Sequence, residues 1–79
     1  MEELLNVLSA IKDGIDFEKE TGLIENGLLS SLDAMMIIAA INENFGIEIP
    51  ATEILPQNFD SAEAMWNMIQ RIRGKFIGP

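Results

Sequence analysis

Two adjacent serines are the residues of this chain with the clearest capacity for chemistry. Ser30 and Ser31 precede a dense apolar stretch, and Asp33 follows them in what would be the first turn of a helix. A serine at a helix start commonly accepts a backbone hydrogen bond and does nothing more. The same place suits a covalently attached phosphodiester, because free amides and the macrodipole at a helix N-terminus stabilise an anion. The spacing alone leaves both interpretations open.

The chain lacks the side chains that most enzymes use near neutral pH. Its 79 residues include no histidine, cysteine or tyrosine, so it offers no ordinary base, thiol nucleophile or soft metal ligand. Carboxylates occur in pairs, yet a helical chain this short has little room for a desolvated pocket that would raise a carboxyl pKa. We therefore predict that the chain is not an enzyme and that it holds no metal.

A second candidate feature is the surplus of apolar surface between residues 31 and 45. Two helical stripes can be separated, one with Ala34, Ile37, Ile38, Ile41 and Phe45, the other with Leu32, Met35, Met36 and Ala39, continued by Glu43. A small helical domain covers one stripe, so the second is a candidate docking face. Paired methionines suit adaptable contacts, although the spacing equally allows Met35 and Met36 to fill the core.

The first half of the chain must place these residues through two helices and a long connection. The first helix ends near Gly14, and its apolar stripe consists of Leu4, Val7, Leu8, Ile11 and Ile15. Residues 16–30 show no sustained period but contain enough apolar side chains to predict a long packed loop. The next helix starts at the two serines and runs to about Phe45, where Gly46 ends it.

The second half contains one short and one long helix. Residues 52–55 have room for only about one helical turn before Pro56. Asp60 is the expected N-cap of the last helix, with Glu63 at capping-box spacing; its apolar stripe consists of Met65, Met68, Ile69, Ile72 and Phe76. Trp66 lies off this stripe and is interpreted as a partly buried packing residue. The prediction is an all-α bundle of three longer helices and one short third helix.

The charge of the chain excludes several classes of partner. The net charge is −8, and residues 1–70 carry −11, because Arg71, Arg73 and Lys75 stand together near the C-terminus. A body this acidic repels nucleic acid and anionic lipid and favours basic protein surfaces. The longest apolar run, residues 34–41, is too short to span a bilayer. We expect one domain over residues 1–79 that is cytoplasmic, monomeric and not inserted in a membrane.

Three segments resemble the acyl and peptidyl carrier protein family. They are the stretch from Leu23 to Pro50 centred on Asn-Gly-Leu-Leu-Ser-Ser-Leu, the Asn-Phe-Gly-Ile-Glu-Ile-Pro segment within it, and Pro-Gln-Asn-Phe-Asp-Ser at residues 56–61. The last segment looks most like free-standing aminoacyl carriers, including D-alanyl carrier proteins. The resemblance covers nearly the whole chain and implies a four-helix carrier-protein bundle.

The resemblance also implies a cofactor and a set of partners. In the family, a serine followed by leucine accepts 4'-phosphopantetheine from coenzyme A through a phosphopantetheinyl transferase, and the matching residue here is Ser31. The attached thiol would hold an acyl or aminoacyl group as a thioester. An adenylating enzyme would load it, and an acyltransferase or condensing enzyme would receive it. The partner-binding residues implied are Leu32, Asp33, Met35, Met36, Ala39 and Glu43.

The sequence departs from the family at the position before the modified serine. Ser30 replaces the usual Asp, which leaves open an unmodified carrier fold that binds a partner through the apolar face of its second helix. Ser30 is alternatively a better helix cap that frees Ser31 to point outward. Met36, Ala39 and Asn42 also stand where fatty-acid carriers place acids, which disfavours a fatty-acid synthase as partner. Fatty acyl, polyketide, amino acid and D-alanine cargoes all remain open.

Overall fold

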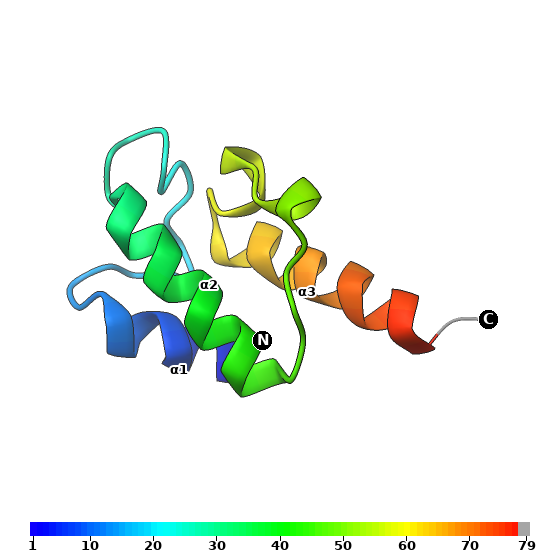
Figure 1. The fold of residues 1–79 in the computed structure, drawn as a ribbon. Helices are drawn as coiled ribbons and strands as arrows, with labels where there is room; N and C mark the ends of the chain where they lie inside the picture. The colour runs from blue at the N-terminus through cyan, green and yellow to red at the C-terminus, as the bar shows by residue number, and fades with distance from the viewer. Residues whose placement is uncertain (78–79) are drawn as a thin grey trace.

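The computed structural model is all-helical where it describes the chain, which is the backbone of residues 1–77 and the side chains of residues 1–74. Its α-helices are α1 (Glu2–Ile11), α2 (Ser31–Phe45) and α3 (Ala62–Ile77) (Figure 1). The short third helix predicted at residues 52–55 is replaced by two 3-10 turns, Ala51–Glu53 and Pro56–Asn58. The reason is local: a proline precedes each turn or opens it, and its missing N–H prevents the continuous bonding that an α-helix needs.

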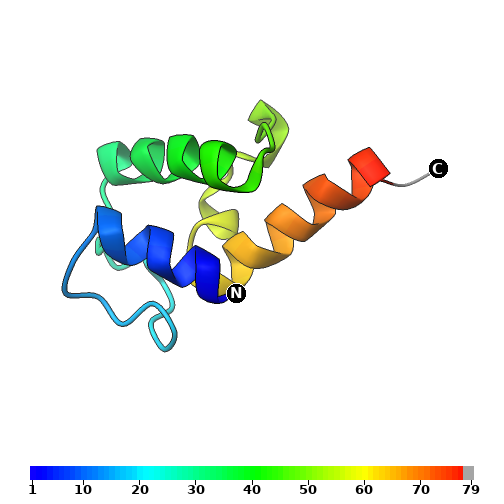
Figure 2. The same ribbon diagram turned by 90° about the horizontal axis from the view of Figure 1, so that it is seen from below.

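Helices α1 and α2 lie side by side in opposite directions, whereas α3 starts beside this pair and runs away from it, so that its C-terminal half extends past both (Figures 1 and 2). The three helices and the loops between them enclose one buried apolar cluster: Leu4, Leu8, Phe17, Leu23, Leu29, Ile37, Ile41, Ile49, Phe59, Ala62, Met65, Met68, Ile69 and Ile72. The predicted stripe of α3 is therefore confirmed through Ile72. The remaining predicted residue, Phe76, lies outside the described side chains.

Helix α1 ends three residues earlier than predicted. Lys12 is already extended, with φ −130° and ψ 110°, so the helix stops at Ile11 rather than near Gly14. Gly14 instead forms a turn at φ 85°, where its amide donates to the Asp13 carboxylate at 3.1 Å. Ile15 consequently packs against the core from the connection and not from the helix.

The connection from residue 12 to residue 30 is tied to the start of α3. Asp60 holds it, because its carboxylate accepts the amides of Ile24 and Glu25 at 3.0 and 3.1 Å and its carbonyl accepts the amide of Leu23 at 2.8 Å. The prediction that Asp60 caps the last helix is therefore wrong. Ser61 is the cap, since its hydroxyl accepts the amide of Ala64 at 3.0 Å.

The end of α2 follows the sequence pattern closely. Gly46 adopts the left-handed conformation at φ 62° and its amide donates to the Asn42 carbonyl, which closes the helix as predicted. The Asn42 side chain then accepts the amide of Ile49 at 2.9 Å and directs the chain across the bundle. Trp66 packs edge-on against Phe45, with ring centroids 6.2 Å apart, as expected of a partly buried packing residue. None of the described helices is long and apolar enough to cross a membrane.

Candidate functional site

The two serines at the start of α2 have separate tasks. Ser30 is the N-cap: its hydroxyl accepts the amide of Asp33 at 3.1 Å, while the Asp33 carboxylate accepts the amide of Ser30 at 2.9 Å. These two bonds form a reciprocal capping box. Ser30 is thus the helix cap of the pair, which agrees with the sequence interpretation that Ser30 caps the helix and leaves Ser31 free to point outward.

Asp33 is anchored from a second direction by Lys12. The Lys12 ammonium lies 3.1 Å from the Asp33 carboxylate, so the residue directly after α1 is joined to the first turn of α2. The hydrogen bond from the Ser30 amide, and then that from Lys12, lower the pKa of Asp33 below its ordinary value. Asp33 is only 7% exposed. The prediction that Asp33 is an exposed acidic flank of the docking face is therefore corrected, because the residue is buried and its carboxylate is bound by the Ser30 amide and by Lys12.

Ser31 stands one residue further along, at the first helical position, and it is exposed. Its hydroxyl makes no hydrogen bond to any residue that the structure describes. The backbone amides of Ser31 and Leu32 also lack protein acceptors within this part of the chain, as the first amides of a helix usually do. An accessible hydroxyl thus lies beside two amide donors and at the positive end of the α2 dipole.

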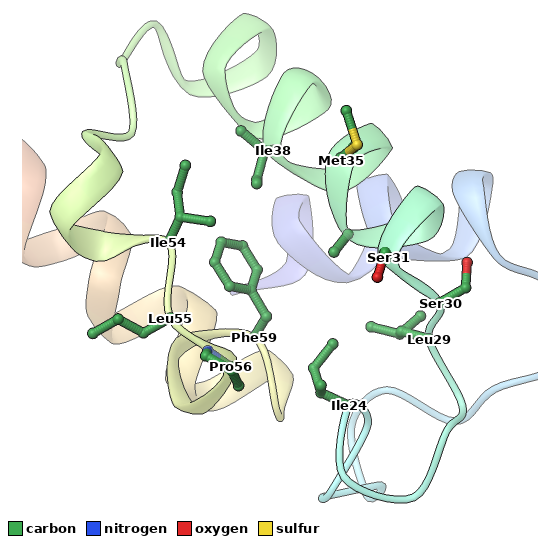
Figure 3. A pocket seen from close by; sticks show the side chains of 11 residues that line it. Ile24, Leu29, Ser30, Ser31, Met35, Ile38, Ile54, Leu55, Pro56 and Phe59 are labelled. Atoms are coloured by element: carbon green, nitrogen blue, oxygen red, sulfur yellow. The ribbon is translucent and has the colours of Figure 1, made fainter.

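Ser31 lines an open apolar groove of about 500 Å³. Figure 3 shows Met35 and Ile38 on successive turns of α2 along one wall and Ile54, Leu55 and Pro56 on the other. The remaining lining residues are Ile24, Leu29, Ser30, Ala34 and Phe59. The groove has no charged side chain in its lining, so it favours apolar groups over ionic ones.

The second stripe of α2 is exposed. The exposed fractions of Leu32, Met35 and Met36 are 65%, 66% and 41%, and Ala39 and Glu43 are also exposed. The alternative in which the two methionines fill the core is therefore wrong. The first stripe faces inward, with Ile37 and Ile41 fully buried.

Two exposed apolar residues near the site were missed by sequence reasoning. Ile54 and Leu55 are 45% and 41% exposed and lie across the groove from α2 (Figure 3). The sequence places them in a short helix, where one face would be buried. The available signal was Pro56 directly after them, since the residue before a proline is pushed toward an extended conformation.

Comparisons with known proteins identify the family of the chain. The family described as "Phosphopantetheine attachment site" matches residues 2–69. A D-alanyl carrier protein of Bacillus velezensis is 33% identical over 76 residues, which cover 94% of this chain and 88% of that protein. No solved structure shows a significant match. This chain belongs to the phosphopantetheine-bearing carrier family, and it is a carrier with covalently attached 4'-phosphopantetheine rather than an enzyme.

Proposed function

We propose that Ser31 is the attachment residue and that the chain presents an acyl or aminoacyl group on 4'-phosphopantetheine held there. The observation that carries this proposal is the division between the serines: Ser30 is engaged in the capping box, whereas the Ser31 hydroxyl is exposed and has no protein partner among the described residues. A hydroxyl that is already a helix cap would have to give up that bond on modification. Ser31 can be modified without that cost.

The surroundings of Ser31 suit a phosphodiester. The amides of Ser31 and Leu32 are available donors, and the dipole of a 15-residue helix favours an anion at this end. Asp33, the acid closest in sequence, directs its carboxylate to Lys12 and the Ser30 amide, which limits its repulsion of a phosphate. When bound, phosphopantetheine supplies the thiol that holds the cargo, a group that this cysteine-free chain lacks.

The partner surface proposed for this function is the exposed stripe of α2, formed by Leu32, Met35, Met36, Ala39 and Glu43. We assign it to the adenylating enzyme that loads the carrier. The stripe starts directly after Ser31, so an enzyme that acts at the end of the attached arm meets this helix first. The acidity of residues 1–70 favours an enzyme with basic residues around its docking site. Buried Asp33 is left out of this surface.

The cargo class is inferred from the relative's cargo and from the docking stripe. The D-alanyl carrier relative favours an aminoacyl group, and the predominantly apolar docking stripe, in which Glu43 is the one acid, supports an adenylating enzyme over a fatty-acid synthase. We therefore propose an amino acid as the first cargo to test. The single buried cluster also supports the proposal that residues 1–79 act as one carrier domain.

The test is the intact mass of the chain after incubation with coenzyme A, magnesium and a broad-specificity phosphopantetheinyl transferase. We expect a gain of one phosphopantetheine, absent in Ser31→Ala and retained in the matched neighbour Ser30→Ala. A gain lost in Ser30→Ala but kept in Ser31→Ala would move the site by one residue. No gain with several transferases, and none after Ser30→Asp, would favour the unmodified interaction module, in which the exposed α2 stripe binds a partner directly.

A further inference from the structure

The wall of the groove opposite α2 has almost no apolar anchor of its own. Within residues 51–57 every side chain is exposed or half-buried, and the nearest buried apolar residues are Ile49 before the segment and Phe59 after it. Short 3-10 turns are weakly stable by themselves, because each contains few and poorly aligned hydrogen bonds. Something other than hydrophobic burial must therefore hold Ile54 and Leu55 in place.

Three polar side chains supply this anchor, and we call them the polar clamp: Glu53, Asn58 and Arg71. The Arg71 guanidinium donates to the Glu53 carboxylate at 2.8 Å and to the Asn58 side-chain carbonyl at 3.3 Å. The Asn58 amide group donates to the Glu53 backbone carbonyl at 2.7 Å and to its carboxylate at 3.2 Å. Glu53 ends the first 3-10 turn and Asn58 ends the second, so both turns are joined to α3.

The geometry of the clamp suits a positioning role. Asn58 is 9% exposed and the Glu53 side chain 18%, so the bonds between them are partly shielded from water, whereas the Arg71 side chain is 49% exposed. The residues between the two clamped ends are Ile54, Leu55, Pro56 and Gln57. The first three of these line the same groove as Ser31 (Figure 3). Fixing both ends therefore fixes the width of the groove.

We propose that the polar clamp positions the Ile54–Pro56 wall, and that the phosphopantetheinyl transferase reads this wall together with α2 when it reaches Ser31. The inference rests on the proposed function, because the transferase approaches Ser31 only if Ser31 is the attachment residue. Ser31 and the wall line the same open groove, so an enzyme that encloses the Ser31 hydroxyl meets both sides of it. Arg71 is a positioning residue: it acts through Glu53 and Asn58.

Amide hydrogen exchange on the unmodified chain tests whether the polar clamp positions the Ile54–Pro56 wall. The amides of Ile54, Leu55, Asn58 and Phe59 are hydrogen-bonded within the turns and report their order. In Arg71→Met we expect their protection to fall on the order of three- to tenfold, with no change at the amide of Ile41 in α2. Arg73→Met is the matched control, because it removes the same charge from the same helix and Arg73 has no partner among the described residues.

Arg71→Lys keeps the charge and a donor, so it should restore most of the protection. Equal protection in Arg71→Met and the wild type would overturn the positioning role. So would an equal loss in Arg71→Met and Arg73→Met, because net charge alone would then explain it.

Modification kinetics test whether the phosphopantetheinyl transferase recognises this wall. The probe is coenzyme A with a broad-specificity phosphopantetheinyl transferase. We expect KM for the carrier to rise about threefold in Arg71→Met with kcat nearly unchanged, and to return in Arg71→Lys, because docking is impaired and chemistry at Ser31 is not. An unchanged KM despite lost amide protection would show that the transferase does not read the wall. If the wild type is not modified at all, the proposed function fails, while hydrogen exchange still decides the role of the clamp.

Discussion

The assignment of Ser30 as cap and Ser31 as attachment residue predicts opposite effects of two neighbouring substitutions. Ser30→Ala removes the hydroxyl that accepts the Asp33 amide at 3.1 Å and so breaks half of the capping box. Loss of a serine N-cap typically costs about 1 kcal/mol of stability. For a chain of this size that corresponds to a fall in Tm of roughly 4 to 8 °C. Ser31→Ala removes a hydroxyl without a protein partner, so its effect should stay within about 0.5 kcal/mol.

Thermal and urea unfolding of the unmodified chain, followed by circular dichroism, measure both effects under the same conditions. Ser30→Asp is the matched third variant, because aspartate caps a helix as well as serine does and it restores the residue usual in the family. We expect it to lie nearer the wild type than Ser30→Ala. If Ser31→Ala proves more destabilising than Ser30→Ala, the roles of the two serines are reversed, and the case for Ser31 as the modified residue collapses with them.

Three further predictions concern charge and docking. Because the pKa of Asp33 is lowered in the folded chain, its stabilisation is complete above the unfolded pKa of about 3.9 and is lost as the pH falls through the lower folded value. The difference in Tm between the wild type and Asp33→Asn should therefore narrow from about pH 6 to about pH 3; a constant gap would contradict this sign. Added salt should raise the Tm of this acidic chain by screening self-repulsion, and a flat or falling salt series would show that repulsion is unimportant. Met36→Glu should slow loading by an adenylating enzyme while Ser31 is still modified, since it charges the docking stripe and spares the attachment residue; unchanged loading kinetics would place the interface elsewhere.

The parts of the fold that the sequence predicts are those decided within one helical turn. Gly46 ends α2 because a left-handed residue is needed there, and Ser30 caps it through an acceptor three residues away. The division of α2 into a buried and an exposed stripe likewise follows from helical spacing and from the small size of the chain.

Three of the corrections involve contacts between residues distant in the sequence. Asp60 and Ser61 are both capable caps, and the choice between them depends on loop amides about 35 residues away, which Asp60 binds instead. Lys12 forms an ion pair with Asp33, 21 residues later in the chain. Asp33, which the helical pattern of α2 assigns to the surface, is therefore buried. Arg71 looks like a cation that complements the end of a helix, yet its partners are Glu53 and Asn58. No local pattern contains these pairings.

The hydrogen bonds that Asp60 makes to Leu23, Ile24 and Glu25 also bear on how the chain folds. They join residues more than thirty positions apart, so forming them costs the conformational entropy of closing a long loop. They can form only when the two halves of the chain are packed together. A fragment that stops before Asp60 contains Ser31 and all of α2. It lacks the Asp60 acceptors that hold residues 23–25, in the segment that leads to Ser31. The segment that leads to Ser31 is therefore ordered by non-local contacts, and contacts of this kind raise the contact order of an otherwise helical and locally bonded chain.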